Sequence, residues 1–260
     1  PLYVNVTSYE IHENCRIIAD RAFSYSTAGV SELEKIKIPD NVKHVGYAAF
    51  ENCTRLITVE IGKGVNIIKE ATFYNCISLF RITIPDSVIH IEYNAFNGCR
   101  KLHEIYYSGN IDDLVQIEGV KNIMQVGTEK VLWINDKMTT EVNITVTGKI
   151  NERAFWGFNI KSVNIGNNVT IVGSYAFKAC SSLQKVTIGN NVTSIENNAF
   201  DGCNKLSQVF YCGTAEQWGK IKIFDGNNEL KNATLYYYSE SKPVGRGNYW
   251  HYVDGEIVVW

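Results

Sequence analysis

The chain has 260 residues, of which 45% are hydrophobic and 20% are charged, and its formal net charge is −2. This composition is typical of a soluble globular or repeat protein that is long enough to bury a sizeable core. Lys and Arg are scattered rather than clustered, which argues against a nucleic-acid partner, and no window approaches the roughly 18 apolar residues of a membrane span. The opening residues PLYVNVTSYE have no signal-peptide pattern, so we expect any signal or anchor to lie outside this chain.

Along the chain, the first predicted elements belong to a repeat that is marked by an Ala-Phe pair or, once, by Thr-Phe. Its phenylalanines are Phe23, Phe50, Phe73, Phe96, Phe155, Phe177 and Phe200. Phe50, Phe73 and Phe96 are 23 residues apart, as are Phe177 and Phe200. A fixed period of this size is typical of a solenoid.

Each repeat places apolar residues at the same phases, and these predict one short strand per coil. A Leu six residues after the Phe is followed by two alternating β-formers, such as Val59 and Ile61 or Val186 and Ile188. Alternation puts these side chains on one face, and no coil can bury its apolar side alone, so each strand should pair in parallel with the strand of the next coil. The predicted fold class is a repeat solenoid with coils of about 23 residues, mostly β and irregular with a few short helices.

Five cysteines also recur, each three residues after a Phe: Cys53, Cys76, Cys99, Cys180 and Cys203. The total of seven is odd, and no C-x-x-C pair occurs, which argues against a disulfide framework or a zinc ribbon. We expect reduced, buried thiols that donate weakly to backbone carbonyls, with stacked disulfides or a metal site as the alternatives. The sequence does not indicate the environment of Cys212.

A second repetition, at an offset of 104 residues, divides the chain into two blocks, residues 1–140 and 141–260. Each block ends in a closing element with a short helix capped at Asn110 or Thr214, followed by a strand near Val131–Ile134 or Leu235–Tyr238. If the closing elements separate the blocks, the linker should lie near Asp136–Glu141.

The last residues, GNYWHYVDGEIVVW, predict a β-hairpin that turns at Asp254 and Gly255. Because a solenoid must cover its end coils, we expect this hairpin to be part of a cap. The alternative is that Tyr249, Trp250, Tyr252 and Trp260 form an aromatic platform for a ligand.

The repeat resembles the BspA-like, or Treponema-type, leucine-rich repeats, as IPDNVKHVGYAAFENCTRL and IPDSVIHIEYNAFNGCRKL illustrate. The resemblance covers nearly the whole chain and implies a leucine-rich-repeat solenoid at the cell surface or secreted. It also implies, for some members, adhesion to host matrix proteins or to other microbes. It carries no catalytic residues.

Catalysis has little support from the residues. The histidines form no i, i+4 metal pair, and His44 and His90 occupy the same phase of their coils, as in a surface column. No Walker loop, nucleophile elbow or dinucleotide motif occurs. We therefore predict that the chain is not an enzyme and has no cofactor or metal.

Residues between the inward apolar positions of each strand should face outward and form one extended recognition surface. Aromatic residues and Arg are the commonest anchors of protein interfaces. The predicted ligand-binding residues are Arg81, Tyr106 and Phe210, followed by Lys37, Glu60 and Lys185. The expected partner is a host or microbial surface protein or glycan. The alternative is a spacer or scaffold whose binding is carried by the aromatic C-terminal segment or by a missing part. The sequence does not indicate the oligomeric state.

Overall fold

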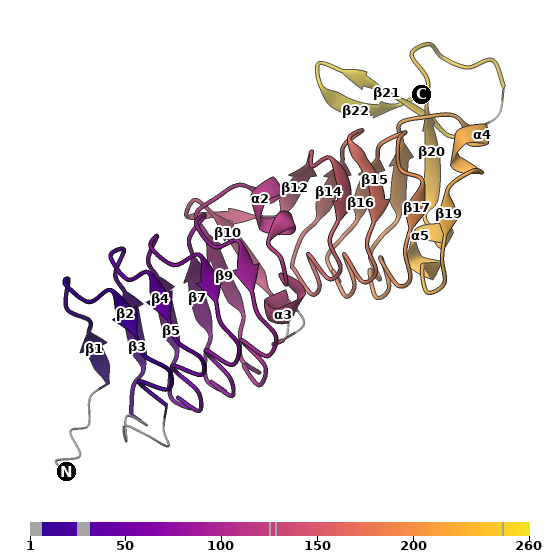
Figure 1. The fold of residues 1–260 in the computed structure, drawn as a ribbon. Coiled ribbons are helices and arrows are strands. Elements are labelled where there is room, and N and C mark those ends of the chain that lie inside the picture. The colour runs from indigo at the N-terminus through magenta and orange to yellow at the C-terminus, as the bar shows by residue number, and fades with distance from the viewer. Residues whose placement is uncertain (1–6, 25–31, 125, 128, 246) are drawn as a thin grey trace. The chain divides into compact units, whose positions relative to one another are not determined.

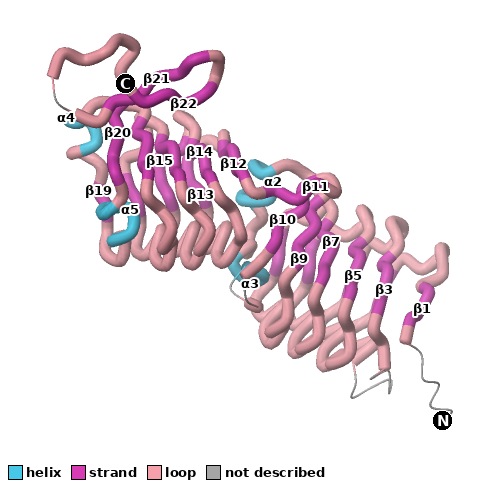
Figure 2. Tube along the Cα trace, turned by 180° about the vertical axis from the view of Figure 1, so that it is seen from behind, coloured by secondary structure: helices cyan, strands magenta, loops and turns pink. Residues whose placement is uncertain are grey.

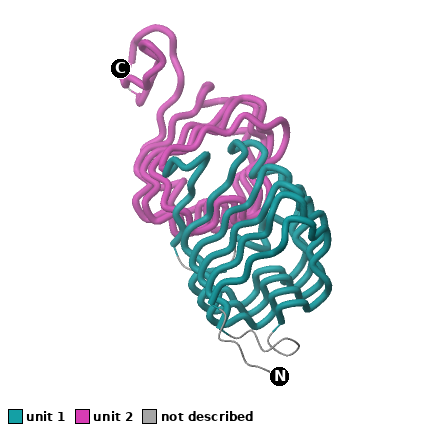
Figure 3. The backbone as a smooth tube through the Cα atoms, turned by 90° about the vertical axis from the view of Figure 1, so that its left-hand side faces the viewer, with its two compact units in different colours: residues 1–139 teal, residues 140–260 magenta. Residues whose placement is uncertain are grey.

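The computed structural model describes residues 7–24, 32–124, 126–127, 129–245 and 247–260. The chain divides into two compact units, Pro1–Thr139 (unit 1) and Thr140–Trp260 (unit 2), shown in Figure 3. The boundary expected from the sequence, between residues 140 and 141, lies next to this division.

Unit 1 is built around one sheet with a strand from each coil (Figure 1). In spatial order its strands are β1 (Ser8–Glu10), β3 (Lys35–Ile38), β5 (Thr58–Ile61), β7 (Arg81–Ile84), β9 (Glu104–Tyr107), β10 (Val131–Ile134) and β11 (Lys137–Thr139). Neighbours from β1 to β10 pair in parallel, and β11 is antiparallel to β10. Two smaller sheets pair β2 (Ile17–Ile18) with β4 (His44–Val45) and β6 (Ile67–Ile68) with β8 (His90–Ile91). The helices are α2 (Ile111–Gln116) and α3 (Lys121–Met124).

Unit 2 repeats this plan. Its main sheet has the order β12 (Glu141–Ile144), β14 (Ser162–Ile165), β16 (Lys185–Ile188), β18 (Gln208–Tyr211), β20 (Thr234–Tyr238), β21 (Tyr249–Val253) and β22 (Glu256–Val259). A second sheet has the order β13 (Gly148–Ile150), β15 (Val169–Val172), β17 (Ser194–Ile195) and β19 (Lys222–Ile223). Short helices α4 (Ala215–Trp218) and α5 (Asn228–Asn232) complete the unit, and Figure 2 shows that loops and turns connect the strands of each coil. The predicted solenoid of parallel strands is confirmed.

Phenylalanine stacking runs through the core of both units. The rings of Phe50 and Phe73 lie 5.3 Å apart at 9°, and those of Phe155 and Phe177 lie 5.3 Å apart at 3°. These four side chains are at most 1% exposed. One coil supplies only one layer of this stack, so its ring is buried only when neighbouring coils are present.

The cysteine ladder is made of free, buried thiols, as predicted. Each Sγ donates to the Phe carbonyl of the preceding coil; Cys76 bonds to Phe50 and Cys203 to Phe177, both at 3.1 Å. Burial raises the pKa of Cys53 and Cys99 to about 12, so these thiols remain protonated at neutral pH. Cys212 is half-buried, and burial raises its pKa to about 11.

The turn around each Phe contains left-handed backbone that the repeat pattern did not predict. The residue two positions before the Phe has positive φ in all seven repeats: Arg21, Ala48, Ala71, Asn94, Arg153, Tyr175 and Asn198. A second left-handed position follows two residues after the Phe, for example Asn75 (φ 55°) and Ala179 (φ 57°). Residues other than Gly pay a steric cost here, which the packing of each turn on its neighbours must offset.

The closing elements form as expected, with one addition. The Asn110 side chain accepts from the Asp113 N–H, and Thr214 and Gln217 form a capping box at α4. In unit 1 the last strand, β10, continues through left-handed Asn135 and Asp136 into antiparallel β11. The two units meet between Thr139 and Thr140, inside the segment Asp136–Glu141 expected from the sequence, and strands β11 and β12 flank this junction directly.

The C-terminal hairpin is confirmed as β21 and β22, which turn at left-handed Asp254 and Gly255. It extends the main sheet of unit 2 because β21 pairs in parallel with β20. Trp250 is fully buried, and its Nε1 donates to the Tyr211 carbonyl at 3.0 Å. Trp250 therefore belongs to the packed interior and cannot serve in the alternative aromatic platform, although Tyr252 and Trp260 are 46% and 38% exposed.

Candidate ligand-binding face

The outward side chains of the main sheet in unit 1 form two parallel rows, which we call the unit 1 strand face. In β3, β5, β7 and β9, exposed or half-buried residues alternate with buried ones, so alternate positions point away from the core. One row is Ser8, Lys35, Thr58, Arg81, Glu104 and Val131; the other is Glu10, Lys37, Glu60, Thr83, Tyr106 and Trp133. Four of the six predicted binding residues, Lys37, Glu60, Arg81 and Tyr106, lie on this face.

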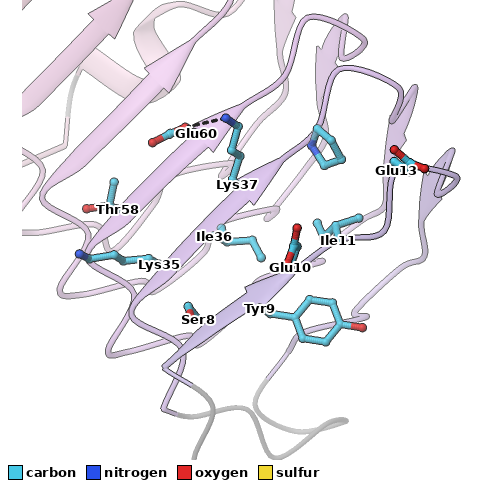
Figure 4. A pocket seen from close by; sticks show the side chains of 11 residues that line it. Ser8, Tyr9, Glu10, Ile11, Glu13, Lys35, Ile36, Lys37, Thr58 and Glu60 are labelled. Carbon is cyan, nitrogen blue, oxygen red and sulfur yellow. Dashed lines mark ion pairs between the residues drawn. The ribbon is translucent and has the colours of Figure 1, made fainter.

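The N-terminal end of this face is polar and hollowed (Figure 4). A cavity of about 550 Å³ is lined by residues of β1, β3 and β5 and the segment after β1. The Lys37 ammonium lies 3.8 Å from the Glu60 carboxylate, and their side chains are 78% and 52% exposed. An ion pair this exposed contributes little to stability, so both side chains can be redirected toward a ligand at small cost.

The middle of the face holds a more tightly bonded group. The Arg81 Nε donates to the Glu104 carboxylate at 2.6 Å, and this hydrogen bond raises the pKa of Arg81. The Arg81 guanidinium also lies 5.1 Å from the centre of the Tyr106 ring. Burial raises the pKa of Tyr106, which is half-exposed. These contacts fix the orientation of both side chains before any ligand arrives, which lowers the entropy cost of binding.

Trp133 is a residue of this face that sequence reasoning missed. Its ring stacks on Tyr106 at 5.1 Å and 5°, because the two residues are register partners in β10 and β9. The Trp133 Nε1 is shielded from solvent and has no hydrogen-bond partner among the described residues. Met138, the register partner of Trp133 in β11, is 58% exposed. The alternation in VLWI could have indicated Trp133 if the closing strand had been treated as part of the face.

Phe210, in unit 2, is not available to a ligand, contrary to the prediction. It points to the outward side of β18, but only 2% of it is exposed, because Tyr236 stacks on it at 4.9 Å and Trp250 packs edge-on at 5.7 Å. Thr187, its neighbour in β16, is 3% exposed. Lys185, the remaining predicted binding residue, is half-buried on the outward side of β16.

Within the described ranges, no group of three or more His, Cys, Asp or Glu side chains could hold a metal ion. His44 and His90 lie at the same phase of their coils, as predicted, with Ile67 at that phase in the coil between them. The His90 Nδ1 is 3.4 Å from the Glu118 carboxylate at the surface.

A second aromatic cluster lies in unit 2, away from the strands. Trp156 and Tyr175 stack at 6.1 Å, and the guanidinium of Arg153 and the ammonium of Lys178 lie over both rings. Arg153 and Lys178 also pair with Glu152 and Asp201. Because its cations already have carboxylate partners, we interpret this cluster as a stabilising surface ladder.

The coils, the parallel strand of each coil and the outward face define a leucine-rich-repeat solenoid. The model of the BspA type leucine rich repeat region family matches six copies, over residues 2–116 and 137–241, and the chain belongs to that family. No curated protein matches the sequence.

Several solved structures have similar folds. A leucine-rich repeat protein of T. pallidum is 19% identical, with 78% of this chain and 79% of that chain covered and a TM-score of 0.40. A leucine rich cell surface protein from Faecalibacterium prausnitzii is 19% identical, with 83% and 89% covered and a TM-score of 0.34. The pneumococcal vaccine antigen PcpA is 16% identical, with 86% and 66% covered and a TM-score of 0.42. These are similarities of fold and carry no information about a ligand.

In the described part of the chain, no helix has the length and apolar character to cross a membrane.

Proposed function

We propose that this chain is a non-catalytic recognition module, secreted or displayed at a cell surface, that binds a host or microbial protein or glycan. The observation that carries the proposal is the unit 1 strand face. Lys37, Glu60, Arg81 and Tyr106 lie there in adjacent strands, partly exposed, over a core of stacked rings and buried thiols. A rigid surface of mixed charge and aromatic groups is typical of solenoid binding faces.

The two ends of the face suit different contacts. The hollow beside Lys37 and Glu60 offers exposed charges of both signs, which favour specificity and fast association. The region of Arg81, Tyr106 and Trp133 offers partly desolvated side chains of the types that dominate binding energy. Lys185 extends the proposal to the outward side of unit 2.

A screen of the purified chain on arrays of host matrix proteins, bacterial surface proteins and glycans tests the proposal. The test variant is Arg81→Ala/Tyr106→Ala. Its control is Lys43→Ala/Tyr93→Ala, which also removes one basic residue and one tyrosine, but from exposed positions outside the main sheet. Phe210 is left intact, because replacing a buried ring would confuse a folding defect with lost binding.

The expected result is a ligand bound by the wild type and the control and lost by the test variant, with unchanged thermal unfolding in all three. Binding that survives in the test variant contradicts the assignment of the face. No ligand for any folded, monodisperse sample favours the alternative of a spacer or scaffold. Tyr252→Ala/Trp260→Ala, at exposed positions of the C-terminal hairpin, then tests whether the hairpin carries an interaction, with the fully buried Trp250 left in place.

A further inference from the structure

Each unit contains a stacked aromatic pair at the equivalent position of its main sheet. In unit 1, Tyr106 and Trp133 stack on β9 and β10 at 5.1 Å and 5°. In unit 2, Phe210 and Tyr236 stack on β18 and β20 at 4.9 Å and 16°. Both pairs are register partners on the outward side of the last two coil strands, so the units present one local surface twice.

In unit 2 this surface is occupied by the chain itself. Trp250 meets Phe210 edge-on, with ring centroids 5.7 Å apart at 76°, and it makes similar contacts with Tyr238 at 5.2 Å and Tyr252 at 4.8 Å. The indole N–H of Trp250 donates to the backbone carbonyl of Tyr211, and both Trp250 and Phe210 are buried. An aromatic ring carried on a polypeptide hairpin is therefore a fitting occupant of such a pair.

In unit 1 the pair lacks a comparable cover among the described residues of that unit. Tyr106 and Trp133 are half-exposed, and Met138 beside them is 58% exposed. The buried Trp133 indole N–H has no acceptor, and an unpaired buried donor costs about 1 to 3 kcal/mol. Because this N–H is shielded in the unbound chain, an acceptor on a bound group removes the cost only when the indole edge turns toward the surface.

The geometry favours a polypeptide over a sugar. A sugar ring stacks on an aromatic face, but Arg81 covers one face of Tyr106 and Trp133 covers the other. On Tyr106 only the ring edge remains, and edge-on contact is a preferred arrangement for a second aromatic side chain. Backbone carbonyls of a polypeptide supply acceptors for the indole N–H.

The charge near the pair adds a preference. Arg81 is paired with Glu104, whereas the Asp136 carboxylate, in the turn after β10, has no ion-pair partner within 4.0 Å among the described residues. Asp136 is close enough to Tyr106 to contribute to its raised pKa. A basic residue next to the incoming aromatic ring is therefore favoured over an acidic one.

We propose that the Tyr106–Trp133 pair binds an aromatic side chain of a partner polypeptide edge-on, as Phe210 holds Trp250 in unit 2, and prefers a basic neighbouring residue. This rests on the proposed function and narrows it from a protein or glycan to a polypeptide at this end of the face.

The test follows the five indole N–H signals of the ¹⁵N-labelled full-length chain, with Trp133 assigned through Trp133→Phe. The probes are the blocked tripeptides Lys-Trp-Lys, Lys-Leu-Lys and Glu-Trp-Glu, together with a panel of oligosaccharides. Lys-Trp-Lys should shift the Trp133 signal saturably and downfield, about tenfold more tightly than Lys-Leu-Lys. Glu-Trp-Glu should bind more weakly than Lys-Trp-Lys. Tyr106→Ala should abolish the response, and Phe80→Ala, which removes another exposed ring of unit 1, should not.

Equal binding of the Trp and Leu peptides, or a response to oligosaccharides alone, overturns the inference. The array screen tests the proposed function independently, and that proposal fails if every ligand found there still binds the Arg81→Ala/Tyr106→Ala variant. A glycan that binds through this face leaves the proposed function intact and removes the inference.

Discussion

Raising the pH above 9 should destabilise the fold through its buried thiols. Burial raises the pKa of Cys53 and Cys99 from an ordinary value of 9.0 to about 12. The folded state holds these protons to a higher pH than the unfolded chain does. The stability they contribute is therefore complete below the unfolded pKa of 9.0 and is lost as the pH rises toward about 12. At pH 10 the loss is about 1.4 kcal/mol per thiol, or about 2.8 kcal/mol for both.

The measurement is urea unfolding at a series of pH values from 7 to about 10.5, under reducing conditions, for the wild type and Cys53→Val/Cys99→Val. Lys and Tyr also titrate in this range, so the informative quantity is the difference between the two curves. The variant should lose about 2.8 kcal/mol less than the wild type between pH 7 and pH 10. Parallel curves refute the reasoning, because they show that the free energy of unfolding does not depend on deprotonation of these two thiols.

Three further predictions concern stability and use unfolding by urea. Ala179→Gly should raise the free energy of unfolding by about 1 kcal/mol, because Ala179 has φ 57°. Ala199→Gly, at a fully buried position without positive φ, should lower it by about 1 kcal/mol or more. A change of the same sign in both variants would contradict the strain argument. Trp250→Ala should cost about 3 to 5 kcal/mol, since it empties a fully buried site and leaves the Tyr211 carbonyl without its indole donor; a loss below about 1 kcal/mol would show that the hairpin does not cap unit 2. Thr214→Ala should cost about 1 kcal/mol through the capping box of α4, and Thr234→Ala, at an exposed strand position, should change little.

The solenoid could be predicted because every coil must bury the same apolar side chains against its neighbouring coils. Phe73 and Cys76 recur at fixed phases since the coil above and the coil below present identical neighbours to them. The left-handed turns could not be predicted in the same way. Asn75 and Gly98 are residues that tolerate such backbone, but Ala71 and Tyr175 are not, and only packing between coils explains their conformation.

The candidate face was predicted in part for a related reason. Alternation within one strand is local, so it correctly placed Arg81 and Tyr106 on the outward side. The burial of Phe210 depends on Trp250, which is distant in sequence, and on how β21 pairs with β20. Trp133 was missed because its strand was treated as a closure, although it continues the row of Tyr106.

The nearest-neighbour character of the ladders has an evolutionary consequence. Each thiol, ring and turn of a coil bonds to the coil next to it, as Cys99 does to Phe73 and Phe73 to Ala95. An in-frame gain or loss of one whole repeat therefore removes and restores the same set of contacts. Such a change can lengthen or shorten a unit without requiring new contacts at its closing element.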